Sequence, residues 1–324
     1  MEESTTRRQH GGGGNDGLVG DLSSENLETI TGELADGIVS FAFHSRLSVL
    51  STVFMLFGIG DHILTPQGDD DSNRQLKQVC RRWGISYDFV DTTDLAAIQR
   101  AVLCTTRAIV IKSPAQFGRL EDICSWAKKN DIISIVKHEF VTPQLQQSFE
   151  FGADIVYGET KFLTGQKPIE GGLILTKNRK LADQIDYFKN IVLNMLDPQD
   201  CWLTIHELKT FSARMSRARQ SVQKISARLK NHPKIKAVYY PEFSDLPGLP
   251  EYELMNRHLA STGTVLFFEV ETAALAQKIL HKKLQWLDSI QIGLGKQDIF
   301  LRLSVGVEDP DDLLNDLFAA MEGL

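Results

Sequence analysis

The sequence predicts an α/β fold with a mainly parallel sheet in a large domain and a smaller α/β domain at the C-terminus. Short apolar segments alternate with amphipathic segments through the first half of the chain, which is typical of strands that alternate with helices. The strand segments are continuously apolar, as in residues 108–112 (AIVIK) and 132–136 (IISIV). Such runs indicate strands buried on both faces of a sheet. After Thr176 the pattern changes to a mostly helical stretch.

Composition excludes several classes of protein. The chain has 324 residues and a net charge of −7, and this charge gives no support for a nucleic-acid partner. No run of 18 or more apolar residues is present, so we expect no membrane-spanning helix. The four cysteines are widely spaced, which argues against zinc and disulfides. The N-terminus has no apolar signal core, and we expect a cytoplasmic protein without a metal.

The first half of the chain supplies the alternating elements. Residues 1–25 are polar and carry four successive glycines, which predicts a disordered tail. We expect helices at 27–34, 45–58, 72–83, 94–103 and 120–129, with Ser45 as a possible N-cap. We expect strands at 38–43, 62–65, 87–90, 108–112, 132–136, 154–157 and 173–176.

The second half predicts a separate small domain. Residues 177–228 are mostly helical, with a break and a helix start near Asp197. Strands at 236–240, 264–269 and 300–305, a helix at 273–282 and a helix from Asp309 follow. We therefore expect a large domain at 26–215 and a small domain at 216–324, with the boundary inside a long helix.

The segment 152–172 carries the candidate nucleophile. A short strand ends in a turn that presents Lys161 beside Thr160, and the pair Gly171 and Gly172 opens the next strand. A lysine at the end of a buried strand can form a Schiff base, because partial desolvation frees its amine. The alternative is a solvated surface lysine, which is the commoner case.

Several segments together are stronger evidence for a protein family than this lysine alone. They are STVFMLFGIGDHIL, GISYDFVDTTDL, FVTPQLQQSFEFGADIV, LDPQDCWLTIHELKTFSARM, HPKIKAVYYP and FLRLSVGVEDPDDLL. In these segments the chain resembles the pyridoxal-phosphate (PLP) enzymes of cysteine and methionine metabolism, which include the cystathionine lyases and synthases and methionine γ-lyase. The resemblance runs from about Leu27 to the C-terminus and implies the PLP-dependent transferase fold, aminotransferase fold type I.

The resemblance also implies roles for individual residues. Lys161 occupies the place of the family's S-A-T-K lysine, which forms the internal aldimine with PLP, and Thr160 precedes it. Arg302 matches the arginine of R-L-S-V-G, which grips the substrate α-carboxylate. Ser45 stands in the family's phosphate-binding S-G-M segment. A small amino-acid substrate and a homo-oligomer, or pairing with a related subunit, are the expected partners.

Other positions depart from the family pattern. The aspartate that meets the PLP ring nitrogen in V-D-N-T-F-A-T-P is replaced by Lys137, with Glu139 two residues on. Arg46 replaces the glycine of S-G-M, and we expect it to be a solvated helix-start residue rather than a phosphate ligand. The stacking tyrosine falls on the acidic run 69–72, which we expect to be a solvated turn.

Two longer segments also differ. The family's N-terminal Y-S-R-x-G-N-P-T segment, which reaches the neighbouring subunit, has no match in residues 17–26, and the substrate loop is compressed into residues 291–299. His138 is expected to be a hydrogen-bonded structural residue. The arginines and lysines that follow Cys201, such as Arg214 and Lys224, are expected on an exposed helix face.

These departures leave three hypotheses for function. The first is a divergent homologue of the transsulfuration enzymes whose carbon–sulfur chemistry is impaired or lost, because the ring-nitrogen acid, the ring stack and the phosphate segment are replaced. The second is an active PLP-dependent lyase or transferase with an altered cofactor pocket, including one that uses a neutral pyridine ring. The third is a structural or regulatory subunit of an active relative.

Overall fold

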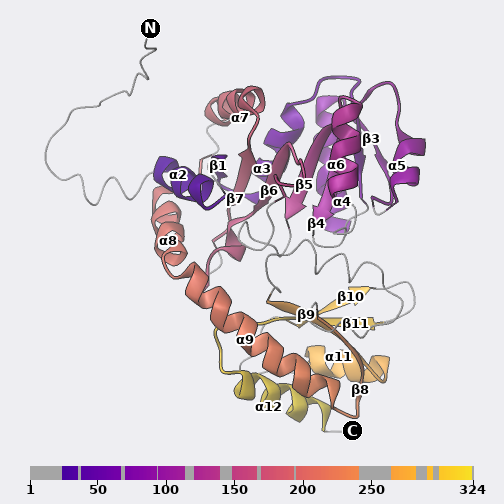
Figure 1. The fold of residues 1–324 in the computed structure, drawn as a ribbon, viewed down its shortest axis with the longest axis vertical. Coiled ribbons are helices and arrows are strands. Elements are labelled where there is room, and N and C mark those ends of the chain that lie inside the picture. The colour runs from indigo at the N-terminus through magenta and orange to yellow at the C-terminus, as the bar shows by residue number, and fades with distance from the viewer. Residues whose placement is uncertain are drawn as a thin grey trace, which may run out of the picture.

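A seven-stranded sheet forms the large unit of the computed structural model (Figure 1). The structure describes residues 24–35, 38–66, 70–92, 94–113, 120–138, 148–165, 169–192, 195–240, 264–281, 290–294 and 299–322. The strands of the large sheet are β1 (Val39–Phe43), β2 (His62–Thr65), β3 (Ser86–Phe89), β4 (Thr106–Ser113), β5 (Ile133–His138), β6 (Ile155–Glu159) and β7 (Gly172–Thr176).

The order of the strands across this sheet is β1-β7-β6-β5-β4-β2-β3. Strands β3, β2, β4, β5 and β6 are mutually parallel, while β7 is antiparallel to both β6 and β1. Parallel strands end at the same edge of a sheet, and this edge is where α/β folds bind ligands. The mainly parallel sheet agrees with the expected fold class.

Helices cover both faces of the large sheet (Figure 1). One face packs on α2 (Ser24–Leu34), α5 (Leu95–Ala101), α6 (Leu120–Lys129) and α8 (Pro198–Leu208). The other packs on α3 (Arg46–Met55), α4 (Asp70–Trp83) and α7 (Arg179–Val192). Successive strand residues point to opposite faces of the sheet. Ile135 packs in the core with α3 and α4, and Val136 packs in the core with α6.

The small unit is an antiparallel sheet with helices on one side. Its strands are β8 (Ile235–Tyr239), β9 (Val265–Val270), β10 (Ile290–Leu294) and β11 (Ile299–Ser304), in the order β10-β11-β9-β8. Its core joins this sheet to α9 (Phe211–Lys230), α11 (Ala273–His281) and α12 (Pro310–Met321). The boundary that we propose between residues 215 and 216 falls inside α9, whose Phe211 packs in the large core and whose Leu229 packs in the small core.

Most expected elements are present, and three local expectations need correction. Strand β2 and helix α6 have the expected bounds. Helix α4 begins at Asp70, so the acidic run enters a helix rather than forming a turn. Strand β10 pairs with β11 where a compressed loop was expected, and helix α2 begins at Ser24, inside the expected tail. Residues 1–23 lie outside the described residues, and no described helix is long and apolar enough to cross a membrane.

Candidate functional site

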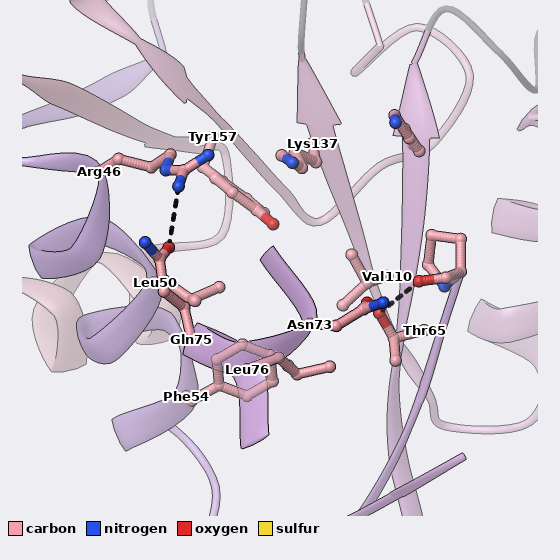
Figure 2. Close-up of a pocket in the computed structure, with 12 residues that line it drawn as sticks. Arg46, Leu50, Phe54, Thr65, Asn73, Gln75, Leu76, Val110, Lys137 and Tyr157 are labelled. Carbon is pink, nitrogen blue, oxygen red and sulfur yellow. Dashed lines mark hydrogen bonds between the residues drawn. The ribbon is translucent and has the colours of Figure 1, made fainter. Parts of the chain in front are cut away.

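A pocket opens at the carboxyl ends of the parallel strands, between the sheet and helices α3 and α4 (Figure 2). Thr65 is the last residue of β2 and Lys137 is the second last of β5, while Val110 and Tyr157 lie in the middle of β4 and β6. The full lining consists of Arg46, Leu50, Phe54, Thr65, Pro66, Asn73, Gln75, Leu76, Val110, Lys112, Lys137 and Tyr157. Its position is the one at which open parallel sheets bind cofactors and substrates.

The strand register aligns three of the polar lining residues. Lys112 on β4 is the Cα partner of Lys137 on β5, and Lys137 is the partner of Tyr157 on β6. Register partners share one face of a sheet, roughly 5 Å apart. Sequence reasoning singled out Lys137 and missed Lys112 and Tyr157. The available signal for Lys112 was its spacing of two from Val110, which places both on one face.

The start of α3 supplies the next wall of the pocket. Ser45 is the N-cap of α3, as expected, and its Oγ accepts a hydrogen bond from Ser48 N at 3.1 Å and lies 2.8 Å from Ser48 Oγ. Arg46 is the first residue of α3, as expected, and its side chain is partly solvated, with 35% of it exposed. Its guanidinium donates to Gln75 Oε1 at 3.1 Å, lies 3.9 Å from Glu159 and lines the pocket (Figure 2).

Lys161 lies at the end of β6, in the short 3₁₀ turn Thr160–Phe162. Its Nζ is 2.5 Å from Glu159 Oε2, and its side chain is 44% exposed, so the amine is partly removed from solvent and lies against a carboxylate. Thr160 is fully buried, and its Oγ1 donates to Ile169 O at 2.7 Å. Lys161 and Thr160 are not among the described residues that line the pocket.

The glycine pair after this turn permits close packing. A Cβ on Gly172 would lie 2.4 Å from Val49 Cγ2 on α3, and one on Gly171 would lie 2.9 Å from Thr160 Oγ1. Both distances are shorter than a carbon contact allows. The absence of side chains therefore lets α3 and the Lys161 turn approach the start of β7.

Glu207 of α8 and Arg214 of α9 form hydrogen bonds with the backbone just after Lys161. Arg214 Nη2 donates to Leu163 O at 2.8 Å and lies 3.3 Å from Glu207 Oε2, which accepts from Gly165 N at 3.1 Å. The Arg214 side chain is only 15% exposed, which corrects its expected place on a solvated face. Lys224 is half-exposed and pairs with Asp311 of α12.

Arg302 lies in the small unit, on β11. It pairs in register with Gln291 of β10 and Phe267 of β9. Leu301 and Leu303 on either side pack into the helix-covered core, so Arg302 lies on the opposite face of the sheet. Figure 1 shows the small sheet between its helices α11 and α12 and the large unit. Ser45 and Arg302 are likewise not among the described lining residues of the pocket.

The remaining candidates have structural roles or lie outside the described residues. His138 is buried, and its Nε2 lies 2.8 Å from Ser148 Oγ, which confirms a hydrogen-bonded structural residue. Glu139 lies outside the described residues. Burial raises the pKa of the Cys80 thiol to about 11 and those of Cys124 and Cys201 to about 12, so these thiols are poor nucleophiles at neutral pH.

Comparison with known proteins identifies the family. The family model for Cys/Met metabolism PLP-dependent enzymes matches residues 15–295. The chain belongs to this family. This family member has the PLP-dependent transferase fold that the resemblance implied, and its relatives are PLP-dependent enzymes of transsulfuration type.

Individual relatives cover nearly the whole chain. Cystathionine gamma-lyase of Bacillus subtilis (strain 168) is 32% identical over 92% of this chain and 86% of the relative. Cystathionine beta-lyase MetC of the same organism is 31% identical over 91% of this chain and 83% of the relative. The crystal structure of cystathionine gamma-lyase from Lactobacillus plantarum complexed with L-serine matches with a TM-score of 0.81 and 28% identity, covering 98% of this chain and 91% of that one.

The residues of the pocket do not fit a PLP ring whose pyridine nitrogen is protonated, as it is in the family. An electron-withdrawing PLP ring needs an acid at its nitrogen, which keeps the pyridine protonated. In the sequence motif of the family, the residue that takes the place of this acid is Lys137, whose cation lines the pocket with Lys112 as its neighbour in register. Like charges about 4 Å apart cost roughly 4 kcal/mol at an intermediate dielectric constant. These residues therefore oppose a pyridinium ion instead of stabilising it.

Proposed function

We propose that this chain is a divergent homologue of the transsulfuration enzymes in which carbon–sulfur bond chemistry is strongly impaired or lost. The observation that carries the proposal is Lys137 in the pocket at the aspartate position, beside Lys112. Elimination from an amino acid bound to PLP depends on the ring as an electron sink. A cation at the ring nitrogen weakens that sink and thereby slows the reaction.

The surroundings of Lys161 support the same proposal. Glu159 stands where the family's S-A-T-K motif has alanine, and its carboxylate is 2.5 Å from Lys161 Nζ. A carboxylate at this distance favours the protonated form of the amine, and a protonated amine cannot attack an electrophile.

An active PLP-dependent lyase or transferase is the second candidate. It is favoured by the retention of Lys161 and Thr160 in the turn after β6, and of Arg302 on β11. Such an enzyme would act on a small sulfur amino acid, in keeping with the names of its relatives. It would have to work with a neutral pyridine ring, because Lys137 opposes protonation.

The impaired chain would act as a structural or regulatory subunit. We propose a cytoplasmic homo-oligomer, or an oligomer with an active relative, as its working state. Co-expression with such a relative, followed by affinity capture through a tag on this chain, tests the pairing. Recovery of the relative in a stoichiometric ratio supports the subunit role, and recovery of this chain alone opposes it.

A spectroscopic experiment separates the two candidates. The purified protein is incubated with PLP, its absorbance is recorded before and after borohydride reduction, and cystathionine cleavage is measured in parallel. We expect little trapped adduct on Lys161, as measured by mass spectrometry, and no turnover above background. Turnover that is abolished in Lys161→Ala and retained in Lys180→Ala, a variant of an exposed lysine on α7, would refute the impairment and establish the active enzyme.

A further inference from the structure

The lining of the pocket has a strong excess of positive charge. Among its twelve described residues, three carry positive charges, Arg46, Lys112 and Lys137, and none is acidic; Glu159, which lies 3.9 Å from Arg46, is outside the lining. The whole chain, in contrast, has a net charge of −7. Grouping cations in one concave site of an acidic protein concentrates a field that attracts anions.

The cations come from rigid elements. Lys112 and Lys137 are register partners on adjacent parallel strands in the middle of the large sheet, and both side chains are partly buried. Arg46 reaches the pocket from the first turn of α3, where Gln75 of α4 orients its guanidinium at 3.1 Å. Sites built on strands and helices hold their groups with less freedom than sites on loops.

Neutral donors complete the polar side of the pocket. Tyr157 follows Lys137 in the register, and Figure 2 shows its hydroxyl directed into the space between Arg46 and Lys137. Asn73 and Gln75 add amide groups from α4. The opposite side is apolar, with Phe54 and Leu76 as its largest side chains. An apolar wall opposite a set of charged donors suits a small ligand with its charges at one end.

We propose that this pocket binds a small dianion, either a phosphate group or a dicarboxylate, through Lys112, Lys137, Arg46 and Tyr157. Charge-assisted hydrogen bonds from guanidinium and ammonium groups are the strong contacts that such oxyanions use. The inference goes beyond the proposed function, since it requires neither PLP nor Lys161 and concerns binding rather than turnover.

Calorimetric titration of the full chain at low ionic strength tests the proposal. Inorganic phosphate and succinate are titrated separately, and their saturable binding at a ratio of one per chain is the expected result. Succinate binding with no phosphate binding would identify a dicarboxylate as the ligand class, and the reverse would identify a phosphate group. Absence of saturable binding for both probes would overturn the proposal.

Variants connect the binding to the pocket. Lys112→Met and Lys137→Met are each expected to weaken binding by about tenfold or more, since each removes a hydrogen bond to a charged group. Lys137→Arg keeps the charge and should bind within about threefold of the parent. Lys180→Met, which removes an exposed cation from α7, should bind like the parent.

Equal weakening in Lys180→Met and Lys137→Met would mean that the anion responds only to total charge, and it would refute the site. The Lys161→Ala variant should bind the dianion normally, which separates this result from any outcome of the PLP experiment.

Discussion

The Nζ of Lys161 lies 2.5 Å from the Oε2 of Glu159, two residues earlier in the chain. Both side chains belong to the turn that ends β6, and the pair is partly exposed to solvent. The candidate Schiff-base lysine is therefore engaged by a carboxylate of its own segment.

Replacement of Glu159 should make Lys161 more reactive. In Glu159→Ala the competing carboxylate is gone, and an exposed ion pair of this kind stabilises by about 0.2–1 kcal/mol, which corresponds to a rate increase of at most about fivefold. The measurement is the rate at which an amine-specific reagent labels Lys161, followed by peptide mass spectrometry. Glu170→Ala, which removes an exposed glutamate on the way to β7, serves as the control. An unchanged labelling rate in Glu159→Ala would show that the pair does not restrain the amine.

Arg214 should stabilise the turn that carries Lys161. Arg214→Ala removes the 2.8 Å bond to Leu163 O and the ion pair with Glu207, and we expect a loss of about 1.5–3 kcal/mol in unfolding free energy. Amide hydrogen exchange in residues 160–165 should become faster. Arg217→Ala is the matched control, because Arg217 is half-exposed and its guanidinium is 3.9 Å from Asp309. Exchange at residues 160–165 that does not differ between the two variants would contradict this role.

The buried pair of Glu28 and Lys189 should make stability depend on pH. Lys189 Nζ lies 2.5 Å from Glu28 Oε1, and the side chains are 6% and 14% exposed. Burial raises the pKa of Glu28, while the bonds from Ala42 N and Lys189 oppose the rise. Because the folded pKa is above the unfolded one, the contribution of Glu28 is most favourable below the unfolded pKa and is lost as pH rises through the folded pKa.

Lys189→Met removes the hydrogen bond and the positive charge by which Lys189 lowers the pKa of Glu28, while the bond from Ala42 N remains, so this pKa should rise further. We expect a loss of about 3–5 kcal/mol in unfolding free energy at neutral pH, where a charge is left buried and uncompensated. The loss should be smaller at about pH 4, where Glu28 is protonated. Urea unfolding at both pH values measures it, with Lys180→Met on the same helix as control. Equal losses at the two pH values would refute the assignment to Glu28.

Gly172 should not tolerate a side chain. In Gly172→Ala the new Cβ would lie 2.4 Å from Val49 Cγ2, and relief requires α3 to move away from β7. We expect a loss of about 1–3 kcal/mol, as for other overpacked sites. Thermal unfolding measures this loss against Gly58→Ala, where the nearest atom would be Asp61 Oδ2 at 3.7 Å. If both variants melted together, the close contact of α3 with β7 would not be a constraint on the fold.

Local chemistry in the sequence was enough to predict most of the elements. Apolar runs and caps predicted β2, α6, the Ser45 N-cap and the helix start at Asp197, because these depend on residues within one turn or one strand. Strand β10 was missed, since its pairing with β11 is a contact between segments and leaves little signal in five residues. The exposed-face interpretation of Arg214 failed for the same reason, because its partner Leu163 is 51 residues away.

The sequence by itself determined the family, the α/β fold and the position of Lys161 after a buried strand. Motifs and apolar periodicity depend only on residues that are close together in the chain. Only the tertiary structure decided which side chains meet. Lys112 and Lys137 are 25 positions apart in the chain, yet strand register makes them neighbours in one pocket. Glu159 and Lys161 are two positions apart, and the 3₁₀ turn after β6 is what brings their charged groups together. Register and turn geometry depend on how the whole sheet packs, and a one-residue shift of a strand would have placed Lys137 on the opposite face.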